Sequence, residues 1–163
     1  MLPGSTDNVG FPPRALLLVS PRLNHGSLPR ILRGTRWDLQ HASTANDALR
    51  AIRRQPDRFQ VVICEDRLPD GNWKSLLAEL ERLPVQPSLV VCSRLADERL
   101  WVDVLKLGAF DLLLCAPFVP GEVLRITENA WTAWTRAVQS TFFSQPVHDH
   151  VTILATLASG NPI

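Results

Sequence analysis

Short apolar runs alternate along the chain with stretches of helical periodicity, and this alternation is the clearest pattern in the sequence. The expected strands cover residues 15–20, 37–43, 60–65, 88–93 and 109–118. After each of them, apolar residues recur at the spacing of a helix with one buried face. The central runs are apolar throughout, as strands are when helices cover both faces of a sheet. The pattern therefore predicts a doubly wound α/β fold with a parallel sheet.

The ends of the expected helices carry the signals that usually start and stop a helix. Thr44 or Ser43 is placed to cap the second helix, and Asp97 is placed to start the fourth. Gly108 is expected to end the fourth helix in a left-handed conformation. The last helix is predicted from about residue 121 to about residue 140, with four apolar side chains facing inward: Leu124, Trp131, Trp134 and Val138.

Length and composition predict one soluble domain. The chain has 163 residues, with 45% hydrophobic and 20% charged residues and a net charge of +1. This charge gives no global attraction to nucleic acid, and no apolar run approaches the roughly 20 residues of a membrane span. Residues 1–13 are expected to form a disordered leader, 14–140 the domain, and 141–163 a tail too short for an output domain. The cysteines lack zinc-type spacing, which favours a reducing cytoplasm.

Polar and reactive side chains stand at the ends of the predicted strands, where open parallel sheets bind ligands. The third strand ends in two carboxylates, Glu65 and Asp66, just before a Leu-Pro-Asp-Gly turn. The other strand ends place further residues at the same edge of the sheet: Ser20, Pro21, Cys92, Ser93 and Ala116.

Five sequence features, in this order, resemble a response-regulator receiver domain over about residues 14–137: "LLLVS", "VVICEDRLPDG", "LVVCSRLADE", "LKLGAFDLLL" and "APF". The resemblance implies a flavodoxin-like sheet of five parallel strands in the order 2-1-3-4-5, with helices on both faces. It also implies a phosphorylation pocket at the carboxyl ends of the strands.

The first and third strands depart from the receiver pattern. The phosphoacceptor aspartate of receiver domains lies four residues before the proline of the turn, and here this position is Glu65, counted from Pro69. The acidic pair that holds magnesium after strand one is replaced by Ser20 and Pro21. Strand alternation is expected to point Asp66 away from the pocket. Glu65 is interpreted as a solvated carboxylate, with a permanent phosphate mimic as the alternative.

The fourth and fifth strands depart from the pattern as well. The hydroxyl position falls on Cys92, with Ser93 beside it, the lysine position falls on Ala116, and the aromatic switch position falls on Leu113. Phosphoryl transfer needs cations to neutralise developing charge, and magnesium is usually held by carboxylates. We therefore expect a degenerate pocket with no cofactor and with weak or absent magnesium binding.

The three cysteines are interpreted as small buried hydrophobic residues. By alternation along the strands, Cys92 is expected to face the pocket, and Cys64 and Cys115 are expected to face the opposite way.

Tryptophans mark a candidate partner surface. Trp101, Trp131 and Trp134 fall on the last two helices, which receiver domains commonly use to contact partners, with Leu113 on the strand between them. Core packing is the simpler interpretation of each tryptophan, although tryptophan is also enriched at interface centres. A homodimer is expected through these helices or through the tail, whose segment 151–159 is apolar.

The function that follows is a stand-alone, cytoplasmic pseudo-receiver of a two-component or phosphorelay system. It would not be an enzyme and would bind a signalling protein, a histidine kinase or another regulator, without contacts to nucleic acid or membrane. Two alternatives stay open: a receiver that is still phosphorylated on Asp66 or Glu65, and a flavodoxin-like binder of a small ligand. The second lacks a glycine-rich phosphate loop after strand one.

Overall fold

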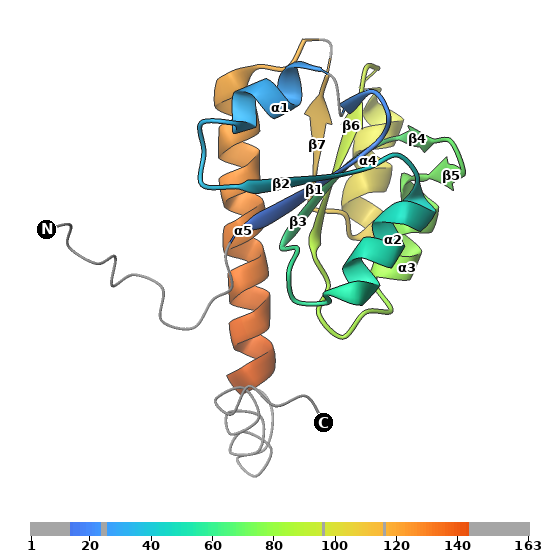
Figure 1. Cartoon of the computed structure of the whole chain (residues 1–163). Coiled ribbons are helices and arrows are strands. Elements are labelled where there is room, and N and C mark those ends of the chain that lie inside the picture. Colours follow the sequence, from blue (N-terminus) through green and yellow to red (C-terminus); the bar gives the residue numbers. More distant parts are fainter. Residues whose placement is uncertain (1–13, 24–25, 96, 116, 144–163) are drawn as a thin grey trace, which may run out of the picture.

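The computed structural model describes residues 14–23, 26–95, 97–115 and 117–143, apart from the side chains of Phe142 and Phe143. Figure 1 shows a central sheet with helices packed on both faces. Its five strands are β1 (Ala15–Val19), β2 (Asp38–Ala42), β3 (Val61–Glu65), β6 (Ser88–Ser93) and β7 (Asp111–Leu114). The helices are α1 (Ser27–Leu32), α2 (Ala45–Arg54), α3 (Trp73–Leu80), α4 (Glu98–Leu107) and α5 (Pro120–Phe143). A small hairpin of β4 (Arg67–Leu68) and β5 (Gly71–Asn72) follows β3.

The strand order confirms the predicted flavodoxin-like fold. All neighbouring strands of the sheet are parallel, and they follow the order β2-β1-β3-β6-β7. This is the predicted order 2-1-3-4-5, with the two hairpin strands left out of the count. Because β1 pairs with β2 on one side and with β3 on the other, the chain reverses its direction of winding between them. In such sheets the carboxyl ends of the strands at this switch point form a crevice.

Two hydrophobic clusters fill the space between the sheet and its helices. One cluster lies under α2, α3 and α4, and the other lies under α1 and α5 (Figure 1). Alternate residues of each strand enter opposite clusters, as the two-residue period of a strand requires. In β1, for example, Leu17 joins the first cluster, and Leu16 and Leu18 join the second.

The helix ends confirm most of the sequence signals. The Thr44 hydroxyl accepts a hydrogen bond from the Asp47 amide at 3.1 Å, and the Asp97 carboxylate accepts one from the Leu100 amide at 2.7 Å. Gly108 ends α4 with φ = 97°, a left-handed conformation that glycine adopts at little cost. Asp70 adds a cap that the sequence did not indicate.

The carboxylate of Asp70 reaches from the loop after β3 to the start of α2. It accepts hydrogen bonds from the backbone amides of Ala45 and Asn46, each at 2.9 Å. Desolvation raises the pKa of Asp70, but the hydrogen bonds from these amides outweigh it and hold the pKa below its ordinary value. The β3–α3 loop is thereby tied to α2.

The last strand and helix differ from the prediction. β7 ends at Leu114 because its pairing with β6 ends there, at Ser93. α5 runs for 24 residues, which is about 36 Å at the usual rise, and passes the expected boundary at residue 140. Leu124 is 39% exposed, so its predicted inward position is wrong. No described helix, α5 included, combines the length and apolar character that a bilayer span requires. The leader (1–13) and residues 144–163 of the tail lie outside the described residues.

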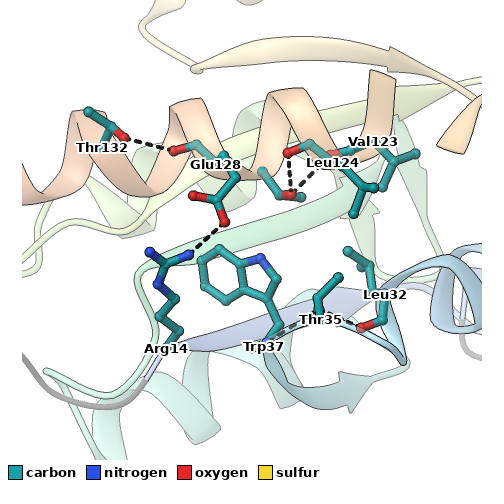
Figure 2. Close-up of polar contacts among 9 residues, drawn as sticks. Arg14, Leu32, Thr35, Trp37, Val123, Leu124, Glu128 and Thr132 are labelled. Atoms are coloured by element: carbon teal, nitrogen blue, oxygen red, sulfur yellow. Dashed lines mark hydrogen bonds and ion pairs between the residues drawn. The ribbon is translucent and has the colours of Figure 1, made fainter. Parts of the chain in front are cut away.

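At the amino end of β1, Arg14 joins the sheet to α5. Its Nη1 lies 2.6 Å from Oε1 of Glu128, and its guanidinium carbon lies 3.9 Å from the ring centroid of Trp131 and 5.9 Å from that of Trp37. Figure 2 shows Arg14 and Trp37 below Glu128 of α5, with the ion pair dashed. We refer to Arg14, Trp37, Glu128 and Trp131 as the Arg14 clasp. An ion pair and two cation–π contacts satisfy this one cation.

Candidate functional site

A cavity of about 520 Å³ opens at the carboxyl ends of β1, β3 and β6, where the doubly wound fold predicts a ligand site. We call it the carboxyl-end cavity. Its lining includes five of the residues predicted for the degenerate pocket: Ser20, Pro21, Glu65, Cys92 and Ser93. The sixth, Ala116, lies outside the described residues. The sheet therefore brings together residues from three strand ends that are far apart in sequence.

Both carboxylates at the end of the third predicted strand line this cavity. Glu65 is the last residue of β3 and is half-buried, in register with Cys92 of β6. Asp66 lines the same cavity, so the expectation that it points away was wrong. The strict alternation applies only within the strand, and the strand ends at Glu65. The Asp66 amide still donates to the Cys92 carbonyl at 2.9 Å, which keeps this residue beside β6.

Ser93 supplies the hydroxyl that contacts an acid in this site. Its Oγ lies 3.3 Å from Oδ2 of Asp66 and 3.0 Å from the Leu95 carbonyl, and its single proton can be donated to one of them at a time. Ser93 is 3% exposed, so this side chain is held in place. Ser20 is fully buried, and its Oγ accepts a hydrogen bond from the Arg22 amide at 3.0 Å.

The cysteines lie differently from one another. Cys64 packs in the cluster under α2, α3 and α4, and Cys92 lines the cavity, as alternation predicted. Cys115 was expected to face away, but it packs against the same cluster as Cys92 and lines the cavity. It lies two residues after Leu113, and residues two apart share a side of the strand. Burial raises the pKa of the Cys115 thiol, Glu65 raises it further, and Arg94 opposes these effects.

The cavity contains fewer acids than the magnesium site that the receiver resemblance implies. The positions after β1 carry Ser20 and Pro21, so among the described lining residues the carboxylates are those of Glu65 and Asp66. Magnesium prefers near-octahedral oxygen ligands that include carboxylates. Within the described ranges, no group of three or more His, Cys, Asp or Glu side chains comes together to hold a metal.

The tryptophans of the predicted partner surface separate into exposed and buried residues. Trp101 is 51% exposed on α4. Leu113 is fully buried and Trp134 is 4% exposed, so neither forms part of a surface as predicted. Trp131 is half-buried against Arg14. The role of Trp101 in binding stays a prediction.

Large apolar side chains are exposed on the same elements that were predicted to carry the partner surface, although Trp101 is the one predicted residue among them. The large hydrophobic residues that are exposed in the described part of the chain all lie between the end of β6 and the first turns of α5: Leu95, Trp101, Leu105, Leu107, Leu114, Val119 and Leu124. We call these residues the α4–β7–α5 face. The sequence signal for this face was the apolar stripe of α4. The stripe is wider than the part of the helix that packs on the core through Leu100 and Val104.

Comparisons with known proteins agree with this architecture. No family model matches the chain. The chain is 29% identical over 123 residues to the methanogenesis regulatory protein FilR1 of Methanothrix harundinacea, covering 73% of this chain and 28% of that protein. It therefore spans less than a third of the length of this relative.

Solved receiver domains share the fold. The signal receiver domain of an HD domain-containing protein from Pseudomonas fluorescens superposes with a TM-score of 0.69 at 20% identity, covering 83% of this chain and 98% of that one. A CheY-like receiver domain protein from Methanospirillum hungatei gives 0.62 at 20% identity, covering 77% and 98%. These similarities confirm the receiver-domain fold that the sequence motifs indicated.

Proposed function

We propose that this chain, which has the fold of a response-regulator receiver domain, is a pseudo-receiver that acts by binding a signalling protein without phosphoryl transfer at its carboxyl-end cavity. The receiver fold supports a signalling role. The observation that carries the finer proposal is the cavity itself, which keeps its position in the fold but has Ser20 and Pro21 where the receiver resemblance implies metal-binding acids.

Phosphoryl transfer to a carboxylate depends on positioned positive charge. The transferred group spreads negative charge over its oxygens, and a bound metal normally neutralises it. Here the β1 end offers the hydroxyl of Ser20 and the ring of Pro21 in place of acids, and the Ser20 oxygen already accepts from the Arg22 amide. Without a metal, Glu65 and Asp66 would have to accept a negatively charged group while carrying negative charge themselves.

The α4–β7–α5 face supplies the surface for a constitutive partner. Exposed apolar side chains that form a contiguous patch usually mark an interaction site, and we infer that these residues form one. Since β7 is the edge strand between α4 and α5, a partner seated there would cover residues from all three elements. We propose that this face binds a second copy of the chain or another signalling protein, such as a histidine kinase.

One observation favours a second candidate function, phosphorylation on Asp66. Asp66 lines the cavity, and the Ser93 hydroxyl lies 3.3 Å from its carboxylate. A hydroxyl beside the acceptor could stabilise a transferred group. The missing metal donors speak against this candidate.

Incubation of the full chain with acetyl phosphate and magnesium, followed by intact-mass measurement, tests the proposal. We expect no gain of a phosphoryl group. A gain that disappears in Asp66→Asn would establish the second candidate, and a gain that disappears in Glu65→Gln would place the acceptor at the receiver position. Restoring a lysine by Ala116→Lys alone is expected to leave the mass unchanged, because the metal donors are still missing.

A further inference from the structure

Three arginines surround the carboxyl-end cavity, and the proposed function makes no use of them. Arg22, Arg67 and Arg94 line the cavity: Arg22 and Arg94 lie in the loops after β1 and β6, and Arg67 begins the hairpin strand β4 after β3. All three are exposed. Distant segments of the chain therefore place three arginines around one hollow.

These guanidinium groups carry no ion pair in the part of the chain that the structure describes. Glu65 and Asp66 share the cavity with them, but these acids also make no ion pair within 4.0 Å among the described residues. Elsewhere in the described part of the chain, Arg14 pairs with Glu128 and Arg58 pairs with Asp38. The cavity thus keeps cationic groups close to acids without neutralising them.

The chemistry of the lining favours a bound oxyanion. Guanidinium groups bind phosphate and carboxylate oxygens with paired N–H donors and stay charged at any physiological pH. Three guanidiniums and two carboxylates leave the cavity with one net positive charge. Buried Ser20 uses its oxygen as an acceptor, so its hydroxyl proton is available to a further oxygen. A volume of about 520 Å³ accommodates a phosphate monoester as well as inorganic phosphate.

We propose that the carboxyl-end cavity binds a phosphate-type oxyanion non-covalently and without a metal, through Arg22, Arg67 and Arg94. This inference rests on the proposed function in one respect, that no covalent phosphoryl group forms there. The bound ion would lie at the strand ends next to Leu95, the most exposed residue of the α4–β7–α5 face.

The first test titrates the full chain with inorganic phosphate or glycerol 2-phosphate in the presence of EDTA, followed by amide chemical shifts. We expect saturable shifts at residues of the three loops. Tighter binding of the monoester identifies an esterified ligand, and equal or tighter binding of the inorganic ion identifies free phosphate. Absence of saturable shifts with both probes would overturn the proposal.

Charge variants give effects of opposite sign. Arg22→Ala, Arg67→Ala and Arg94→Ala should each weaken binding by about three- to tenfold, the range for losing a partly exposed charged contact. Asp66→Asn should tighten binding by about two- to fivefold, because it removes a repelling charge without changing shape. Arg54→Ala is the matched control, since Arg54 is exposed at the far end of α2 and should change nothing. Equal weakening by Arg54→Ala would show a non-specific charge effect and overturn the site.

Cys115 gives a second readout within the native chain. Cys64 and Cys92 are fully buried, and Cys115 is the half-buried thiol that lines the cavity. Neutral iodoacetamide should therefore alkylate Cys115, and bound phosphate should slow the reaction by covering the thiol and disfavouring its thiolate. In Arg94→Ala this protection should require higher phosphate. Alkylation that is insensitive to saturating phosphate would contradict binding beside Cys115.

The two proposals fail separately. Covalent labelling by acetyl phosphate would overturn the pseudo-receiver function, while metal-free binding of phosphate would still establish the anion site. Absence of both labelling and binding would overturn the anion site and leave the pseudo-receiver function in place.

Discussion

Arginine serves two different purposes at the two ends of the sheet. At the amino end, Arg14 is held by Glu128 and lies over Trp131. At the carboxyl end, Arg94 and two further arginines line a hollow without an ion pair among the described residues. A cation that its own fold satisfies contributes to stability, whereas a cation left unpaired is available to a ligand. The amino end is therefore the structural end of this domain, and the carboxyl end is the candidate binding end.

The largest effect that tests this contrast is expected at Trp37. This indole is 7% exposed and packs with the cluster under α1 and α5. Trp37→Ala should lower the free energy of unfolding by about 3–5 kcal/mol, the usual cost of emptying a large buried site. Urea unfolding followed by circular dichroism measures the change. Trp101→Ala, at a 51% exposed indole, is the matched control and should cost less than about 1 kcal/mol.

Arg14 and Arg94 offer the direct comparison between the two ends. Arg14→Ala removes an ion pair and a close cation–π contact, and should lower the free energy of unfolding by about 1–2 kcal/mol. Arg94→Ala should change it by less than about 0.5 kcal/mol, because Arg94 is exposed and has no ion pair with any described residue. Equal losses in the two variants would show that the carboxyl-end arginines are structural, which would remove the contrast.

Asp70 tests whether the carboxyl end also contains a structural carboxylate. Asp70→Asn weakens the acceptor of two backbone amides and should cost about 0.5–1 kcal/mol at pH 7, a small value because the side chain is exposed. The folded-state pKa of Asp70 is lowered, so its contribution is present above the unfolded pKa of about 4 and is lost as the pH falls through the folded pKa. Unfolding measured from pH 7 to pH 3 should show the two proteins converging in acid. A constant difference would assign the effect to another cause.

The smallest effect on the free energy of unfolding is expected for Trp101→Ala, which should instead reduce self-association. Trp101→Ala should leave the unfolding free energy nearly unchanged but reduce self-association, because Trp101 lies on the α4–β7–α5 face. Light scattering at micromolar concentration measures the mass. Arg54→Ala, on the exposed side of α2, is the control for a surface change elsewhere. A wild-type chain that stays monomeric would contradict the expected dimer.

Most of the fold could be predicted from the sequence because its signals are local. Continuous apolar runs, a left-handed glycine at Gly108 and capping side chains at Thr44 and Asp97 each specify a few neighbouring residues. The Asp70 cap joins segments 24 and 25 residues apart, and no local pattern announces such a contact. β7 likewise ends at Leu114 because its pairing partner β6 ends at Ser93. The length of β7 therefore depends on a neighbouring strand and not on its own sequence.

The site could be predicted less completely than the fold. Strand-end counting placed Ser20, Glu65 and Cys92 in one cavity, because register in a parallel sheet follows from strand position. Asp66 was misplaced because alternation was extended past Glu65, the last residue of β3, whereas Cys115 lies on the side of the sheet that Leu113, two residues earlier, indicates. The arginines were missed because they lie in the connections beyond the sheet strands, whose positions depend on the whole fold.

The Arg14 clasp also affects the intrinsic fluorescence of this protein. The chain has five tryptophans and no tyrosine, so its near-ultraviolet emission comes from indole alone. Two of these indoles, Trp37 and Trp131, lie beside the Arg14 cation, whose field acts on their excited states. No described residue that lines the carboxyl-end cavity is a tryptophan. The intrinsic fluorescence should therefore change strongly when α5 separates from β1. It should change little when an ion binds in the carboxyl-end cavity.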